Sequence, residues 1–431
     1  MRAIRAAIVH CRGEPEAGNE ASAIEYFDDG VLVLEGGRVV GLGSAEEWLA
    51  SPAAGVTVED RRGYLLVPGF VDTHIHYPQT DIIAGHGKQL MDWLEHYVWP
   101  IEARFNDQQT GAATAEFFLD ELLRNGTTTA CVFGTVHVAS IDTFMAAALR
   151  RGMRMIAGKV LMDRNCPETL REDAGDGIGK SAELIERWHG KGRLAYALTP
   201  RFAPTSSPQL LQAISELLRS QNDLYLQTHL AECQDETRLV AELFPESSSY
   251  LGVYDQFGLV IERSVFAHGI HIDHDDRRRM AQAGSAISFC PTSNMFLGSG
   301  LFNYQAAKRA GIRVGLGSDV GAGTRFGISE TAAEAYKVCR LRGDDLHPFE
   351  AFYLATLGGA RALRLDDSIG NFENGKEADF VLLDYNATPL LARRTAVATD
   401  LEERLFALMM LADDRAVAET YVMGERVHER S

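Results

Sequence analysis

Two histidines stand one residue apart at the end of an apolar run. They are His74 and His76 in PGFVDTHIHYPQ, residues 68–79. Side chains at positions i and i+2 of a β-strand point to the same face, so these two imidazoles project together. A buried polar group costs free energy unless it is hydrogen-bonded or binds an ion. The pair is therefore either two hydrogen-bonded core residues or part of a metal site.

Ionisable residues also end three later apolar segments. These are His229 and Glu232 in THLAE, His268 in AHG, and Asp319 in GSD. One metal ion would explain all of these groups together, because imidazole nitrogen and carboxylate oxygen suit zinc or another borderline divalent ion. No thiolate accompanies them, which is typical of a catalytic rather than a structural site.

The segments that carry these residues alternate with segments long enough for helices. The β-rich runs are 65–76, 127–134, 154–163, 193–202, 223–232, 264–271, 285–293 and 312–319. Residues 114–126 and 207–221 have apolar residues at helical spacing, and the second begins with Ser207-Pro208, a typical helix start. This alternation predicts an α/β fold, and eight strands favour a closed (β/α)8 barrel of the TIM type. Active sites of such barrels lie at the carboxyl ends of the strands, where these histidines fall.

The two ends of the chain are β-rich without this alternation. Turn-like DDG and EGG interrupt the first end, and short strands recur in 375–385 and 417–429. Neither end could bury an apolar face alone, so we expect them to pair. The predicted organisation is a small β-sandwich formed by residues 1–66 and 372–431 around a catalytic barrel of residues 67–371.

Composition excludes several classes of protein. The chain has 431 residues, of which 46% are hydrophobic and 24% charged, and a net charge of −18. This charge argues against nucleic acid or an anionic membrane as a partner. The six cysteines form no C-x-x-C pair, and no apolar stretch reaches the roughly 18 residues that span a bilayer. A cytoplasmic protein is expected.

At this point a family resemblance emerges. PGFVDTHIH, HLAE, AHG and GLGSD occur in this order and resemble the amidohydrolase superfamily, specifically its metal-dependent nucleobase deaminases. HIHYPQ (74–79), DWLEHYVWPIE (92–102), TPRFAPTS (199–206) and CPTSN (290–294) favour the members that act on guanine. The resemblance covers roughly residues 65–345. It implies the hydrolytic deamination of guanine to xanthine and ammonia.

The resemblance implies one divalent metal, zinc or alternatively iron. Its ligands would be His74, His76, His229, His268 and Asp319. Some relatives hold two metals bridged by a modified lysine at the end of strand four, where this chain has Thr199-Pro200-Arg201. The metal would lower the pKa of a water molecule to roughly 7. Glu232 would then shuttle protons, with Asp319 and His268 as the other catalytic groups.

Four further residues are predicted to bind the substrate. Gln79 offers an amide donor and acceptor, and Arg201 offers donors to a carbonyl oxygen and ring nitrogen, as arginine does to guanine in DNA. Arg201 could instead form a salt bridge on the barrel rim. Phe202 would flank the base or belong to the core, and Trp93 would be part of a lid or a packed loop residue. Cys290 has no nearby base relay and is interpreted as a small buried residue.

Other functions remain open from the sequence. Another deaminase or chlorohydrolase of the superfamily, acting on 8-oxoguanine, a triazine or an adenosine-type compound, would share the metal ligands and differ at Gln79 and Arg201. A catalytically inactive barrel that serves as a binding or scaffold protein is the alternative of another class. The resemblance also implies a homodimer that takes a small nucleobase.

Overall fold

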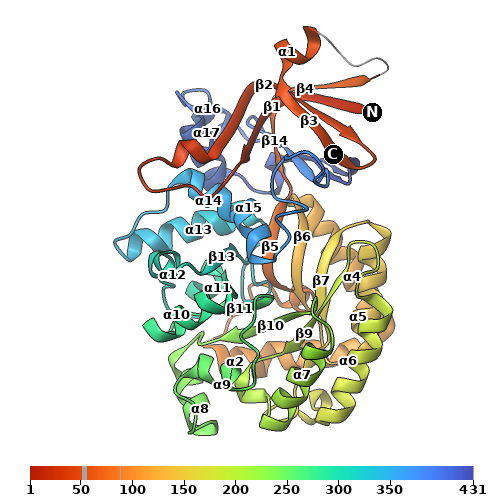
Figure 1. Cartoon of the computed structure of the whole chain (residues 1–431), viewed down its shortest axis with the longest axis vertical. Helices are drawn as coiled ribbons and strands as arrows, with labels where there is room; N and C mark the ends of the chain where they lie inside the picture. The colour runs from red at the N-terminus through yellow and green to blue at the C-terminus, as the bar shows by residue number, and fades with distance from the viewer. Residues whose placement is uncertain (51–55, 88, 431) are drawn as a thin grey trace.

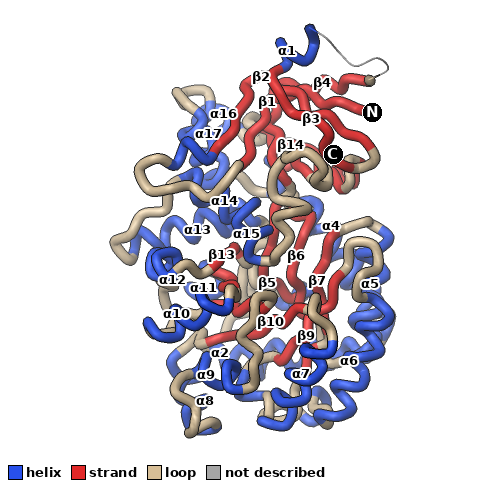
Figure 2. Tube along the Cα trace, viewed as in Figure 1, coloured by secondary structure: helices blue, strands red, loops and turns tan. Residues whose placement is uncertain are grey.

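The computed structural model describes residues 1–50, 56–87 and 89–430. Eight parallel strands form a barrel with helices around it, and a second sheet lies at one end (Figures 1 and 2). The barrel strands are β5 (Phe70–His76), β6 (Thr127–Phe133), β7 (Arg154–Gly158), β9 (Ala195–Pro200), β10 (Tyr225–Leu230), β11 (Ser264–His268), β12 (Ala286–Phe289) and β13 (Arg313–Leu316). The short β8 (Val160–Leu161) pairs with β9. The predicted (β/α)8 barrel is confirmed.

Backbone hydrogen bonds close the barrel between β5 and the segment after β13. The amide of His76 donates to the carbonyl of Val320 at 2.9 Å, and the amide of Asp319 donates to the carbonyl of His74 at 2.9 Å. Thr73 Oγ1 donates to the carbonyl of Leu316, also at 2.9 Å. The first and last strands are thus joined at the place where three of the predicted site residues lie.

Helices follow the barrel strands and cover the outside of the sheet. They are α4 (Gln108–Arg124), α5 (Val138–Arg150), α6 (Ala174–Trp188), α7 (Pro208–Ser220), α8 (Gln234–Leu243), α9 (Tyr250–Gln256), α10 (His274–Ala283), α11 (Pro291–Phe296), α12 (Tyr304–Ala310), α13 (Ile328–Leu341), α14 (Pro348–Ala355) and α15 (Leu357–Ala362). The predicted start of α7 is confirmed: Ser207 Oγ accepts from the amide of Leu210 at 3.1 Å, and Pro208 is the first helical residue. No helix in the described ranges is both long and apolar enough to cross a bilayer.

The run predicted as one strand over 65–76 is two strands that belong to different sheets. β4 (Thr57–Pro68) pairs in the end sheet, and β5 begins the barrel. The chain passes between them at Gly69, where an added Cβ would lie 2.2 Å from Thr128 Oγ1. Only glycine tolerates this close approach without a shift of its neighbour. The apolar run is continuous in sequence because residues on both sides of Gly69 are buried.

Both ends of the chain contribute to a single seven-stranded sheet. Its order is β16-β15-β14-β4-β1-β2-β3, and it contains β1 (Arg2–Cys11), β2 (Ile24–Glu35), β3 (Arg38–Ser44), β14 (Phe380–Asp384), β15 (Val417–Val422) and β16 (Glu425–Glu429). The sheet curls, because β3 at its edge reaches the segment just before β14, which lies several strands away in the sheet order. The amide of Val39 donates to the carbonyl of Lys376, and the amide of Ala378 donates to the carbonyl of Gly37, both at 2.9 Å. One apolar cluster joins residues of β1 and β2 to residues of β14 and β15. The two ends of the chain therefore pair with each other, as predicted. They do so within one curled sheet.

Two helices in the C-terminal segment were not predicted. In chain order, α16 (Pro389–Thr395) and α17 (Leu401–Leu411) come between β14 and β15. Figure 1 shows them at the upper left, near α14. Their buried Leu391, Leu405 and Leu408 join the main apolar core and not that of the curled sheet. The remaining helices are α1 (Ala45–Ala50), α2 (Leu90–Trp93), α3 (Trp99–Glu102), the π-helix η3 (Leu94–Val98) and the 3₁₀ helices η1 (Glu20–Ala23), η2 (Tyr77–Ile82), η4 (Ala103–Asn106), η5 (Glu168–Leu170), η6 (Ala203–Thr205) and η7 (Asp414–Ala416).

Candidate metal and catalytic centre

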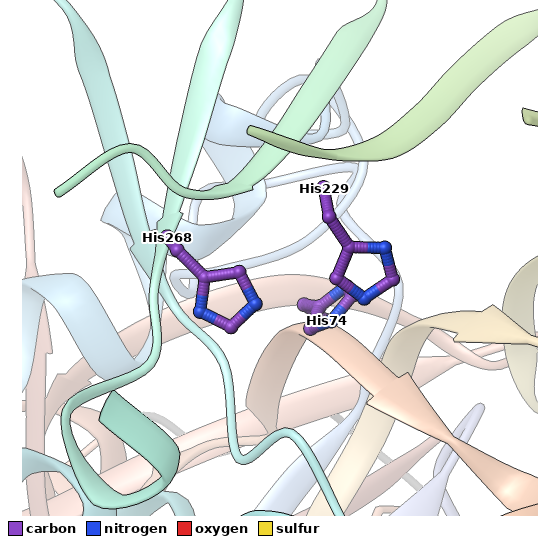
Figure 3. Close-up of side chains that lie close together, drawn as sticks. All are labelled: His74, His229 and His268. Carbon is purple, nitrogen blue, oxygen red and sulfur yellow. The ribbon is translucent and has the colours of Figure 1, made fainter. Parts of the chain in front are cut away.

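Four imidazoles converge at the carboxyl ends of β5, β10 and β11. The rings of His74, His229 and His268 point toward one another (Figure 3). The Nε2 atom of His76 lies 3.2 Å from Nε2 of His74 and 3.3 Å from Nε2 of His229. Nitrogen lone pairs held this close repel each other unless a proton or a cation lies between them. The arrangement is suited to a cation.

Asp319 adds a carboxylate to the same centre. Its Oδ1 lies 3.2 Å from Nε2 of His74 and 3.4 Å from Nε2 of His76, and its Oδ2 lies 3.9 Å from Nε2 of His268. The residue follows β13 with a left-handed backbone, φ 52°, and its amide is held by the carbonyl of His74. The last strand therefore delivers its carboxylate to the two histidines of the first.

Hydrogen bonds orient two of the rings with a lone pair toward the centre. Nδ1 of His229 donates to the carbonyl of Arg201 at 2.6 Å, and Nδ1 of His268 donates to Oδ1 of Asn294 at 2.8 Å. Each Nε2 is then free to bind a metal. Nε2 of His268 and Nδ1 of His76 are buried and have no hydrogen-bond partner among the described residues. A cation bound here would account for the unpartnered Nε2 of His268, which faces the centre.

The protonation states in this cluster also suit a cation. Burial lowers the pKa of His76 to about 3, and burial together with the neighbouring imidazoles lowers the pKa of His229 well below its usual value. Burial opposes ionisation of Asp319, but the imidazoles, His74 first, hold the pKa of that carboxyl well below its usual range. Neutral imidazoles and an ionised carboxylate are the forms that bind metals.

Cys290 lies near this cluster but is a poor ligand. Its Sγ is close enough to His268 and Asp319 to share an ion with them. Burial, however, raises the pKa of the Cys290 thiol well above its usual value, and Sγ donates to the carbonyl of Ser288 at 3.5 Å. The thiol therefore stays protonated, and a protonated thiol does not bind metal.

Glu232 faces the cluster from the loop after β10. The left-handed backbone of Ala231, φ 45°, precedes it. Oε2 of Glu232 lies 3.4 Å from Nε2 of His268, and Oε1 accepts from Ser299 Oγ at 3.1 Å. Burial, together with the charge of Asp319, raises the pKa of Glu232 to about 8. The buried position therefore favours proton uptake by this carboxyl, which suits a group that shuttles protons.

A small cavity opens above these groups. All four predicted substrate-binding residues line it, namely Gln79, Trp93, Arg201 and Phe202. Arg201 is 3% exposed, and its ion pair with Glu102 is buried beside the cavity and not on the barrel rim. Phe202 and Trp93 both belong to the apolar cluster that covers this end of the barrel.

Sequence reasoning missed three buried polar residues that support the site. Glu102 binds Gln79 and Arg201, Asn294 orients His268, and Asp72 accepts from the amides of His74 and Ser318. Glu102 ends the DWLEHYVWPIE motif and Asn294 ends CPTSN. Both motifs were noted, yet nothing in one sequence says which distant side chain each residue contacts.

Comparison with known proteins agrees with this geometry. The sequence pattern of the amidohydrolase family matches residues 65–427, and the chain belongs to that family. Guanine deaminase of Escherichia coli (strain K12) is 49% identical over 411 residues, which cover 95% of this chain and 94% of that protein.

Two solved structures extend the comparison. E. coli guanine deaminase superposes with a TM-score of 0.98 at 47% identity and covers 100% of both chains. Guanine deaminase from C. acetobutylicum, with guanine bound in its active site, gives a TM-score of 0.89 at 29% identity and covers 99% of this chain and 100% of that one. The predicted resemblance is confirmed, and the chain is a hydrolase that acts on carbon–nitrogen bonds.

Proposed function

We propose that this chain hydrolyses the exocyclic C2–N bond of guanine, giving xanthine and ammonia. The observation that carries the proposal is one cavity that unites three features. Three imidazoles and a carboxylate lie at its base with His74 beside them, Glu232 faces them, and Gln79 and Arg201 line its wall. The relatives described above, which are guanine deaminases, support the choice of substrate.

One divalent cation would be held by His74, His76, His229, His268 and Asp319. Zinc is our first choice and iron the alternative, because the donors are imidazoles and a carboxylate without a thiolate. When bound, the cation would acidify a water molecule and make hydroxide available at neutral pH. The expected content is one ion per chain, since the end of β9 offers Thr199 and Pro200 where a bridging lysine would be needed.

Glu232 would move the protons of the reaction. It takes a proton from the attacking water as the water oxygen bonds to C2, and it passes that proton to a ring nitrogen. Asp319 accepts a hydrogen bond from the same water and fixes its direction of attack. Glu232 then takes the remaining hydroxyl proton and delivers it to the amine, so that the C2–N bond breaks, a carbonyl forms at C2 and ammonia leaves. The sum is guanine plus water to xanthine plus ammonia.

Arg201 and Gln79 would recognise the edge of the base. The guanidinium donates to carbonyl oxygen O6 and to N7, the pairing by which arginine reads guanine in DNA. The Gln79 amide supplies a further donor and acceptor. Phe202 and Trp93 enclose the flat apolar faces of the ring and exclude water.

Ammonia release from a panel of substrates tests the proposal. The panel is guanine, 8-oxoguanine, adenine, cytosine and a triazine, each offered to the metal-loaded protein. Guanine should be the preferred substrate. Preference for 8-oxoguanine or the triazine would assign the chain to another branch of the family. No release from any compound, with guanine still bound, would instead identify a binding protein.

We also propose that the protein is a cytoplasmic homodimer. The family resemblance supports the dimer, and six free cysteines support a reducing compartment. Light scattering should give twice the 47.4 kDa mass of one chain. The mass of a single chain would contradict the dimer.

A further inference from the structure

One fully buried carboxylate lies behind the cavity wall and has no part in the proton transfer described above. Glu102, at the end of α3, is 0% exposed. Its Oε1 accepts from Nε2 of Gln79 at 3.1 Å, and Nη1 of Arg201 donates to its Oε1 and Oε2 at 3.0 and 2.8 Å. Both partners are residues that recognise the base in the proposed function. A single carboxylate thus joins the two side chains that contact the substrate edge.

We propose that Glu102 is a positioning residue that sets substrate selectivity, by fixing which hydrogen-bonding groups Gln79 and Arg201 present to the base. Selection would favour a purine with a carbonyl group at the recognised edge over one with an amino group there. This inference rests on the proposed function.

Glu102 fixes the orientation of the Gln79 amide. Nε2 of Gln79 donates to the carboxylate, while Oε1 accepts from the amide of Gly321 at 3.3 Å. Rotating the amide by half a turn would place its oxygen against the carboxylate and its NH₂ against an N–H donor. Both contacts would then be repulsive, so one orientation is selected. The amide therefore presents the same groups to every ligand.

Glu102 also determines which part of the Arg201 guanidinium stays free. Nη1 is occupied by the carboxylate, and the guanidinium carbon lies 4.8 Å from the centre of the Trp99 ring. Within the described part of the chain, Nε and Nη2 form no hydrogen bond, and the side chain lines the cavity. Arginine nitrogens can only donate.

This free side of Arg201 explains the expected selectivity. A carbonyl oxygen facing Nε and Nη2 is satisfied, whereas an amino group in the same place meets only donors and loses its partners. Sites built around such hydrogen bonds reject mismatched ligands strongly. The carboxylate also neutralises the buried guanidinium, which would otherwise be an unpaired charge.

Glu102→Gln tests this role, because it keeps the size of the side chain, removes the negative charge and replaces one of the two acceptor oxygens by an NH₂ donor. In the metal-loaded protein we expect kcat/KM for guanine to fall about 10²-fold, mainly through KM. The ratio of kcat/KM for guanine to that for adenine should also fall about 10²-fold. In equilibrium titration, xanthine should bind at least tenfold more weakly. Metal content should stay near one ion per chain.

A second substitution separates positioning from folding. Glu102→Asp keeps the charge, but its shorter side chain can reach only one of the two partners. It should therefore bind guanine more tightly than Glu102→Gln and more weakly than the wild type. If Glu102→Gln does not fold, Glu102→Asp replaces it in the test, and we expect a KM above that of the wild type with kcat within about tenfold of the wild type.

Glu350→Gln is the matched control. Glu350 is a buried carboxylate in α14, accepts from the Tyr304 hydroxyl at 2.9 Å and pairs with Lys308, away from the cavity. This control should leave KM and selectivity unchanged. Unchanged KM, selectivity and xanthine binding in folded Glu102→Gln would overturn the inference. A wild-type protein that releases no ammonia from guanine would refute the proposed function, and the inference with it.

Discussion

At the scale of single residues, the position of Glu232 leads to a direct test. Its two carboxyl oxygens approach His268 and Ser299, while the Glu232 amide donates to Glu236 Oε2 at 2.9 Å. Glu232→Gln keeps the shape of the side chain but cannot carry a proton. Ammonia release should fall by about 10² to 10⁴, the range of general acid–base catalysis, with metal still bound.

Ammonia assays and elemental analysis of the purified variant measure both effects. Glu242→Gln, an exposed position on α8, is the control and should behave as the wild type. Turnover within tenfold of the wild type in Glu232→Gln would remove Glu232 from its proposed role. Loss of metal together with activity would show that the residue acts on the ligands instead.

How much of the site could be read from sequence depends on the kind of residue. The spacing of His74 and His76 identifies them as candidates. The other three, His229, His268 and Asp319, can be identified because each ends an apolar run at the expected edge of the barrel. Glu102 has no such signal, because its role comes from Gln79 and Arg201, which are distant in sequence and adjacent only in the fold. Pairings of this kind need three-dimensional contacts.

At the scale of elements, the start of α13 contains a carboxyl whose state depends on pH. Burial, reinforced by Asp413, Asp414 and Glu334 and opposed by Arg325, raises the pKa of Glu330 to about 6 from its ordinary 4.5. The folded state therefore binds the Glu330 proton more tightly than the unfolded state. The stability this provides is present below about pH 4.5 and is lost as the pH rises through 6.

Glu330→Gln should remove that dependence. The unfolding free energy of the variant minus that of the wild type should rise by about 1 kcal/mol from pH 5 to pH 7.5. The partial solvation of the carboxyl keeps this value small. Urea unfolding at the two pH values measures it. Glu186→Gln, at an exposed position on α6, serves as the control. An equal stability difference at both pH values would contradict the assignment.

Elements were predicted well where one local pattern dominates. The helix over 207–221 has both a start signal and a repeating apolar face, and it was found within a residue or two of α7. The run over 65–76 was wrong as a single strand, because burial on both sides of Gly69 hides the change of sheet. The helices α16 and α17 were missed, since their apolar faces are completed by the barrel core and not by neighbours in sequence.

At the scale of the whole molecule, an ion-pair network joins the barrel to the curled sheet. Arg193, just before β9, pairs with Asp379 and with Glu377, and Nε of Arg154 donates to Glu377 at 3.0 Å. Nη1 of Arg193 also donates to the carbonyl of Gly152 at 2.9 Å. Arg193→Ala would leave Asp379 buried without its cation. We expect a loss of about 3 kcal/mol in unfolding free energy.

Urea unfolding of the variant and of Arg187→Ala checks this expectation. Arg187 forms a partly exposed pair with Asp142 on the barrel surface, and its loss should cost no more than about 1 kcal/mol. Equal losses in the two variants would mean that the network adds nothing beyond a surface pair. The network itself was invisible in the sequence, although the pairing of the two chain ends followed from their inability to bury apolar faces alone.

The closure of the barrel has a consequence for how the protein is made. The hydrogen bonds that complete it join β5 to the segment after β13, and these same two segments supply His74, His76 and Asp319. On the ribosome, a growing chain therefore lacks the full set of proposed metal ligands until Asp319 has left the exit tunnel. Under the proposed assignment, the complete centre forms late in biosynthesis, and a product that terminates before Asp319 lacks it.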